Sequence, residues 1–360
     1  MQNYHPNVLT PNSVCQHSNL SSEDNKQRIS FNIQGHDPFI DFLKGLCILM
    51  VILTHCIPEK WNAYSLFVLW GRPAVPLFLL IQVFHTYKKG LNEVSFSPSK
   101  IWNRIFKPFA ITEIIIITFQ IIIMIMKGNL NIIQILKDLV HNGGYGPGSY
   151  YPYIYIQMAL LLPCFTNILK KWNITKSIIF FIIFSQGYEL ACCLIGIPEW
   201  IYRLLVFRYI FIIPIGYILA TKGLIINNTT ITLSIISAVF LLFFRYSSID
   251  LYPYFYQTIS WKTCHWICYI FMCYLLLFLV QQGYKKAVRH HISLAFLTKL
   301  GQYSYEIFLF QMFYFAIIHG RLMYWVTIIT NNHARGTLGI IIAMTLCTIP
   351  IVWYKMKIKK

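Results

Sequence analysis

Ten mostly apolar runs recur along this chain of 360 residues, and short polar or charged loops separate them. A helix of about 20 apolar residues is long enough to cross the hydrocarbon core of a bilayer. Charged residues make up only 12% of the chain, whereas about 25% is usual for a soluble domain. The sequence therefore predicts an all-α integral membrane protein, a bundle of about ten transmembrane helices. The predicted spans cover residues 39–58, 64–86, 105–126, 150–169, 176–196, 203–221, 229–246, 264–284, 299–319 and 336–354.

The loop charges predict the orientation of this bundle. One set of loops carries nineteen Lys and Arg residues and the alternate set carries eight, within a net charge of +18. Cytoplasmic loops are enriched in Lys and Arg, so both termini are predicted to be cytoplasmic, as an even number of spans requires. The chain has no sequence pattern typical of nucleic-acid binding, so its basic charge indicates topology. We expect a multi-pass membrane protein in contact with membrane lipids.

The chain is predicted to consist of a tail and one domain. Residues 1–35 are polar and lack the apolar core of a cleavable signal peptide, which indicates a short disordered cytoplasmic tail. Residues 36–357 hold all the apolar runs and form the predicted transmembrane domain. Cys264, His265 and Cys268 are the closest approach to a metal motif, but no second cluster completes four ligands. We therefore expect no metal site.

The first span contains three ionisable residues, Asp41, Lys44 and His55. Such groups are costly in a membrane and are functional candidates by default. Asp41 and Lys44 are three residues apart and can pair on one helix face. His55 follows Lys44 by eleven residues, which places both on one stripe, about 16 Å apart along the axis. The alternatives are an interfacial ion pair for Lys44 and a structural role for His55.

Several other polar residues fall inside the predicted spans. Arg72 and Glu113 either form a structural pair between helices or face a cavity. Glu306, beside Ser304 and Tyr305, is a candidate for the lining of a polar cavity. The amides of Gln82 and Gln311 either bind a ligand or tie helices together. Tyr151 either lines a binding site or belongs to the aromatic belt at the membrane surface.

Five segments, in order along the chain, resemble the membrane-bound acyltransferase-3 family, which includes O-acetyltransferases of bacterial polysaccharides. The family's first span has Arg, ten residues and His, where this chain has Lys44, ten residues and His55. Two departures are Gln82, which stands in a turn that is Ser-Gly-Phe in the family, and Gln311, where many members have His. The segments are 41–55, 71–85, 100–108, 146–163 and 301–311.

The resemblance implies transfer of an acyl group, usually acetyl, from a cytoplasmic acyl-CoA to a hydroxyl of an outward-facing glycan. Acyl-CoA is then a co-substrate, and no cofactor is expected to stay bound. The resemblance also implies a bacterial inner (plasma) membrane, and a sugar that the amides of Gln82 and Gln311 would bind and on which Tyr151 would stack. His55 would act as general base or carry the acyl group itself, with Lys44 and Glu306 as further catalytic candidates. Arg104, Lys100 and Lys107 either hold the CoA phosphates or anchor the chain at the inner face.

A transporter or flippase for a glycan or lipid-linked intermediate is the alternative function. It also needs polar groups in a cavity, but it would be favoured by internal inverted repeats, which the sequence does not show. A third interpretation is a family member that keeps the fold without catalysis, because Lys44, Gln82 and Gln311 depart from the family pattern.

Overall fold

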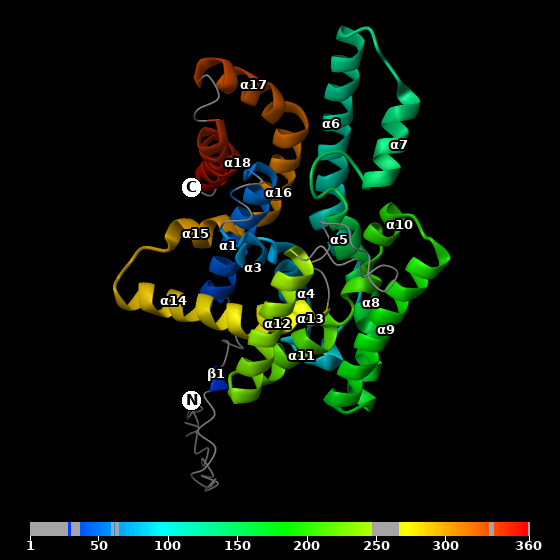
Figure 1. Cartoon of the computed structure of the whole chain (residues 1–360), viewed down its shortest axis with the longest axis vertical. Coiled ribbons are helices and arrows are strands. Elements are labelled where there is room, and N and C mark those ends of the chain that lie inside the picture. Colours follow the sequence, from blue (N-terminus) through cyan, green and yellow to red (C-terminus); the bar gives the residue numbers. More distant parts are fainter. Residues whose placement is uncertain are drawn as a thin grey trace, which may run out of the picture.

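A computed structural model describes residues 28–29, 37–58, 61, 65–246, 266–330 and 335–358. Within these residues the chain is almost entirely helical (Figure 1). Among the described residues, eight helical segments are long and apolar enough to cross a membrane, as expected for a multi-pass helical membrane protein. These segments are Pro38–Cys56, Phe67–Tyr87, Pro98–Met126, Tyr151–Lys171, Ile174–Ile195, Trp266–Arg289, Ser304–Ile329 and Gly336–Ile358.

Two shorter apolar helices, Ile212–Lys222 and Asn228–Phe244, lie where the sixth and seventh spans were predicted. The total of ten spans and the cytoplasmic termini therefore remain predictions. The helices are α1 Pro38–Cys56, α3 Phe67–Trp70, α4 Ala74–Tyr87, α5 Pro98–Ile101, α6 Lys107–Met126, α7 Ile132–Asn142, α8 Tyr151–Lys171, α9 Ile174–Ile195, α10 Glu199–Leu204, α11 Ile212–Lys222, α12 Asn228–Tyr246, α13 Trp266–Ile270, α14 Leu277–Arg289, α15 Ala295–Gln302, α16 Ser304–Phe313, α17 His319–Thr330 and α18 Arg335–Ile358.

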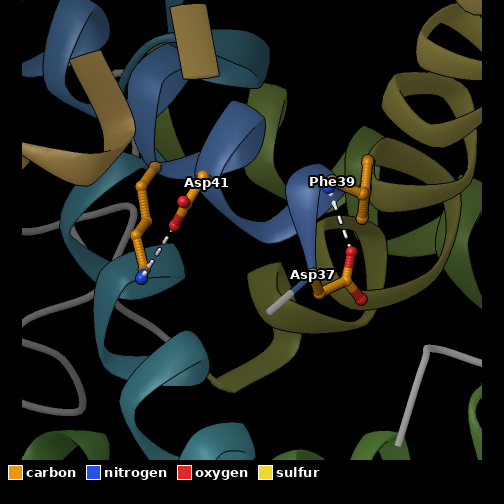
Figure 2. A network of polar contacts seen from close by, with 4 residues as sticks. Asp37, Phe39 and Asp41 are labelled. Atoms are coloured by element: carbon orange, nitrogen blue, oxygen red, sulfur yellow. Dashed lines mark hydrogen bonds and ion pairs between the residues drawn. The ribbon is translucent and has the colours of Figure 1, made fainter. Parts of the chain in front are cut away.

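Helix α1 lies in the middle of the bundle and contacts α4, α14, α15, α16 and α18. It begins where Asp37 caps it, because the Asp37 side chain accepts a hydrogen bond of 3.0 Å from the backbone N–H of Phe39 (Figure 2). Pro38 suits the first turn, where its missing N–H costs nothing. Asp41, one turn further, accepts a hydrogen bond of 3.4 Å from Lys44. The predicted pairing of these two residues is therefore present.

Two glycines allow α1 and α15 to pack backbone against backbone. A Cβ atom on Gly301 would overlap the carbonyl oxygen of Asp41, and one on Gly45 would overlap that of Leu297. Small residues permit this close approach between helices in membranes. The predicted start of the ninth span, at residue 299, is wrong. Residues 295–302 form the separate short helix α15, which packs against α1, and the long apolar segment starts only at Ser304.

Replacing Gly301 by alanine is expected to destabilise the protein by about 1–3 kcal/mol, the usual cost of overpacking a tight contact. The new methyl group meets backbone atoms of α1, so a side-chain rotation cannot relieve the overlap. Thermal unfolding in detergent measures the effect. Gly283→Ala is the matched control, because no atom lies within 4 Å of its added Cβ. Equal unfolding temperatures for the two variants would contradict the packing.

The predicted sixth span, 203–221, is wrong at its beginning. Helix α10 ends at Leu204, a 3-10 turn covers Val206–Tyr209, and α11 starts only at Ile212. Arg208 explains the break, since its side chain is only 2% exposed. Its guanidinium stacks near three tyrosine rings, with 4.5 Å to the centroid of Tyr209. The irregular turn provides this aromatic surrounding for a buried cation.

A short antiparallel strand pair joins the N-terminal part of the chain to the bundle. Strand β1, Arg28–Ile29, pairs with strand β2, Leu224–Ile225, with Arg28 opposite Ile225. Both strands belong to segments predicted to be cytoplasmic. The rest of the predicted tail, at 1–27 and 30–35, lies outside the described residues.

Candidate active site

Two cavities lie back to back between the helices. The first has a volume of about 240 Å³ and is lined by residues at the helix ends predicted to be cytoplasmic, such as Lys44, His85 and Ser304. The second has about 300 Å³ and is lined from the opposite ends by His55, Arg72 and the loop before α8. We call them the inner and the outer cavity. Four side chains line both and form the wall between them: Val51, Val75, Tyr151 and Phe308.

Helix α1 contributes to both cavities from one face. Lys44 lines the inner cavity, Val51 lies in the wall, and His55 lines the outer cavity. The spacing of Lys44 and His55 predicted this common stripe. The His55 side chain is exposed, and its ring packs against Phe315 with 5.6 Å between centroids. An imidazole in this position can meet a hydroxyl that enters the outer cavity.

Gln82 presents a hydrogen-bond acceptor at the inner cavity. Its side chain is 8% exposed, and its Nε2 donates to the carbonyl oxygen of Tyr155 at 2.9 Å. Its Oε1 has no hydrogen-bond partner among the described residues. A buried acceptor without a partner costs free energy, so a ligand with an N–H or O–H group would gain by binding there.

The three predicted donor-binding cations surround the start of α6. Arg104 lies in a π-helical turn, Trp102–Phe106, whose widening fits the following Pro108, because proline has no N–H and crowds the carbonyl four residues before it. Ile105 of this turn lines the inner cavity, and Tyr305 donates a hydrogen bond of 2.6 Å to its carbonyl oxygen. Arg104 itself is exposed and lines neither the inner nor the outer cavity.

Lys100 and Lys107 are also exposed, and neither lines a described cavity. Of the three predicted cations, Arg104 is the one whose neighbour in sequence, Ile105, lines the inner cavity.

The predicted pairing of Arg72 with Glu113 is not present among the described residues. Glu113 is buried, and its Oε2 accepts a hydrogen bond of 2.7 Å from the backbone N–H of Tyr145. It therefore holds the loop that precedes α8. Arg72 instead lines the outer cavity with His55. Arg203 of α10 also lines the outer cavity, and it was not among the site residues predicted from the sequence.

Two further candidates line neither the inner nor the outer cavity. Gln311 is fully buried, and its Nε2 donates to the carbonyl oxygen of Pro147 at 3.1 Å, which ties α16 to the outer loop. Glu306 forms an ion pair of 2.9 Å with Lys355 of α18. It lines a separate lateral groove with apolar residues of α6 and α16. The structure therefore does not bring Glu306 to His55.

The outer cavity is closed on one side by a glycine-rich loop. Gly143, Gly144, Gly146 and Gly148 all have φ between +69° and +132°, a region that glycine adopts easily. Gly146 and Gly148 line the cavity, and a Cβ on Gly146 would lie only 2.7 Å from the carbonyl oxygen of Met312. The run of glycines in the sequence could have indicated this loop.

No group of three or more metal-ligating side chains converges within the described part of the chain. Cys264 and His265, considered above as ligands, lie outside the described residues.

Comparison with known proteins agrees with the motifs. A family model described as an acyltransferase domain, that of the acyltransferase-3 family, matches residues 37–354. The match confirms the resemblance predicted from the five segments and covers all eight candidate spans except the last four residues of the final one. No curated protein and no solved structure gives a significant match.

Proposed function

Because the chain belongs to the acyltransferase-3 family, we propose that it is an integral-membrane O-acyltransferase. It moves an acyl group, in the simplest case acetyl, from cytoplasmic acyl-CoA to a hydroxyl of a cell-surface or exported glycan at a bacterial inner membrane. One observation supports this function above others: two cavities open from opposite helix ends and share a wall of four side chains.

The inner cavity suits the donor. Coenzyme A carries several phosphate charges, and Arg104 with Lys100 and Lys107 supplies cations at the start of α6. The pantetheine arm of coenzyme A contains amide N–H groups. These can donate hydrogen bonds to the Oε1 of Gln82, which has no partner among the described residues. Lys44, held by Asp41, adds a positive charge beside the arm. The thioester would then reach the wall near Tyr151.

The outer cavity suits the acceptor. A sugar hydroxyl is a poor nucleophile at neutral pH, and a neutral imidazole is the natural base for it. In direct transfer, His55 takes the hydroxyl proton, the oxygen bonds to the thioester carbonyl carbon, the C–S bond breaks and the CoA thiolate leaves. In a relay, the imidazole nitrogen first bonds to the thioester carbonyl carbon, and the C–S bond breaks as the CoA thiolate leaves. The hydroxyl oxygen then bonds to the same carbon, the N–C bond breaks, and the hydroxyl proton passes to the freed imidazole. Both routes place His55 at the reacting carbonyl.

Arg104→Ala is expected to raise the apparent KM for acyl-CoA by about tenfold, because one charge-assisted hydrogen bond contributes about 1.5–3 kcal/mol. Arg104→Lys should recover part of the loss, since lysine keeps the charge without the planar fork. Donor-dependence kinetics in membranes measure both. Arg289→Ala, at an exposed cation of the same predicted face, is the control. An unchanged KM in Arg104→Ala would remove Arg104 from the donor site.

The function itself is tested by mass spectrometry of surface glycans from cells with and without this protein. The expected result is a mass difference of the size of an acyl group, which is about 42 Da for each acetyl group added. A change in the amount of glycan at unchanged mass would instead indicate the transporter or flippase considered above.

A further inference from the structure

We propose that the lateral groove between α6 and α16 binds a phospholipid with a primary-amine headgroup, with the lipid ammonium beside Glu306 and the lipid phosphate beside Lys355. The groove has a volume of about 340 Å³ and is lined by Thr112, Ile115, Glu306, Leu309, Phe310 and Phe313. It shares no lining residue with the inner or the outer cavity. The inference therefore does not depend on the proposed acyl transfer.

Two hydrogen bonds bound the groove, one at each end. At the first end the hydroxyl of Tyr305 donates to the carbonyl oxygen of Ile105 at 2.6 Å. At the second end Nε2 of Gln120 donates to the carbonyl oxygen of Ala316 at 3.2 Å. All the lining residues fall between these two contacts in sequence, on α6 and on α16 alike. The groove is therefore a space between two fixed contacts of the helices.

The wall of the groove is mostly apolar. Four of its six lining side chains are aliphatic or aromatic, and the hydroxyl of Thr112 donates to the carbonyl oxygen of Pro108 at 3.0 Å, within its own helix. On the same part of α6, Ile111, Ile114 and Ile115 are 49%, 64% and 44% exposed, in a segment apolar enough to cross a membrane. The surroundings of such a segment are lipid tails, which are as apolar as leucine. An acyl chain is therefore the occupant that this wall fits.

An ion pair stands at the groove and determines the headgroup. The Oε1 atom of Glu306, a lining residue, lies 2.9 Å from the Nζ atom of Lys355, and both side chains are more than a third exposed. A carboxylate accepts several hydrogen bonds and an ammonium donates three, so each partner can bind a further group. Because the pair carries no net charge, it is complementary to a zwitterion with its own ammonium and phosphate rather than to a net anion.

The positions of these two residues match the depth of a headgroup. Glu306 lies in the first turn of α16 and Lys355 in the last turn of α18, so both are at the ends of candidate spans. From Glu306 the groove continues along α16 to Phe313, which is about 10 Å further into the span. A lipid would therefore place its charged end at the ion pair and its chain along the apolar wall.

Native mass spectrometry of the detergent-purified full-length protein tests the inference. The probes are phosphatidylethanolamine, phosphatidylcholine and phosphatidylglycerol with the same palmitoyl and oleoyl chains. The choline headgroup has no N–H, and the glycerol headgroup has no cation. Phosphatidylethanolamine is expected to be retained about fivefold more than phosphatidylcholine, the scale of one partly exposed charge contact.

Charge variants connect that preference to the ion pair. Glu306→Gln should abolish the preference for the ethanolamine lipid and favour phosphatidylglycerol, because the ammonium of Lys355 then loses its carboxylate partner. Lys357→Gln is the matched control, since Lys357 is in the same last turn of α18 and its ammonium lies 5.3 Å from the ring centroid of Trp353. It should leave the preference intact.

A packing variant tests the apolar part of the site. Ile115→Trp places a larger side chain at the groove and should reduce the retention of all three lipids. Ile114→Trp, at an exposed neighbour that does not line the groove, is its control.

Equal retention of the ethanolamine and choline lipids by the wild-type protein would overturn the inference, as would an ethanolamine preference that persists in Glu306→Gln. A dimer in the mass spectra that Ile115→Trp converts to a monomer would assign the groove to a second copy of the chain, and would overturn it as well.

Discussion

His55→Ala is expected to lower acyl transfer by about 100-fold or more, the contribution that a general base typically makes. His55→Gln should be nearly as inactive, because an amide has similar reach but cannot accept the proton. The His55 side chain is exposed at the outer cavity and its one described ring contact is with Phe315, so both variants should still fold. The measurement is acylation of the acceptor per amount of protein in the membrane.

His290→Ala is the matched control, since His290 is exposed at the end of α14 and should be as active as the wild type. Activity of His55→Gln near the wild-type level would reduce His55 to a packing residue. The search for a base would then move to His319, which also contacts Phe315, with 4.9 Å between ring centroids.

Val75→Trp is expected to abolish transfer while acyl-CoA still binds. Val75 lines both cavities and is only partly buried, so a larger side chain there extends into the wall and obstructs the contact between donor and acceptor. An indole occupies far more space than an isopropyl group. Because the protein interior is closely packed, the neighbouring side chains cannot move aside to make room for the indole. Donor binding and acceptor acylation are measured on the same preparation.

Val75→Ala is the control for this position, because it removes bulk from the wall and should keep transfer measurable. Undiminished acylation by Val75→Trp would mean that the acyl group does not pass between the two cavities at this wall.

The sequence was sufficient for features set by local pattern. The apolar runs predicted the long helices, since a membrane span depends on composition over about 20 residues. The Asp41–Lys44 pair and the common stripe of Lys44 and His55 followed from helix geometry alone. The family resemblance followed from five short segments in order.

Features set by contacts between distant segments could not be predicted in the same way. Glu306 adjoins the Ser-Tyr motif in sequence, yet it pairs with Lys355, 49 residues later, on another helix. Gln311 supports Pro147 of the outer loop, and Arg208 interrupts an apolar run because three tyrosine rings surround it. Each outcome depends on which helices are neighbours. The position of Arg203 at the outer cavity depends on the same arrangement.

Transfer across a sealed membrane tests the central claim most directly. Vesicles of the two opposite orientations, prepared from cells that make both this protein and the glycan, receive labelled acetyl-CoA on the outside. Only vesicles that expose the face of Arg104 are expected to label the glycan, on the opposite face, and Val75→Trp vesicles should not. Equal labelling in both orientations, or label on glycan at the same face as the donor, would contradict the account.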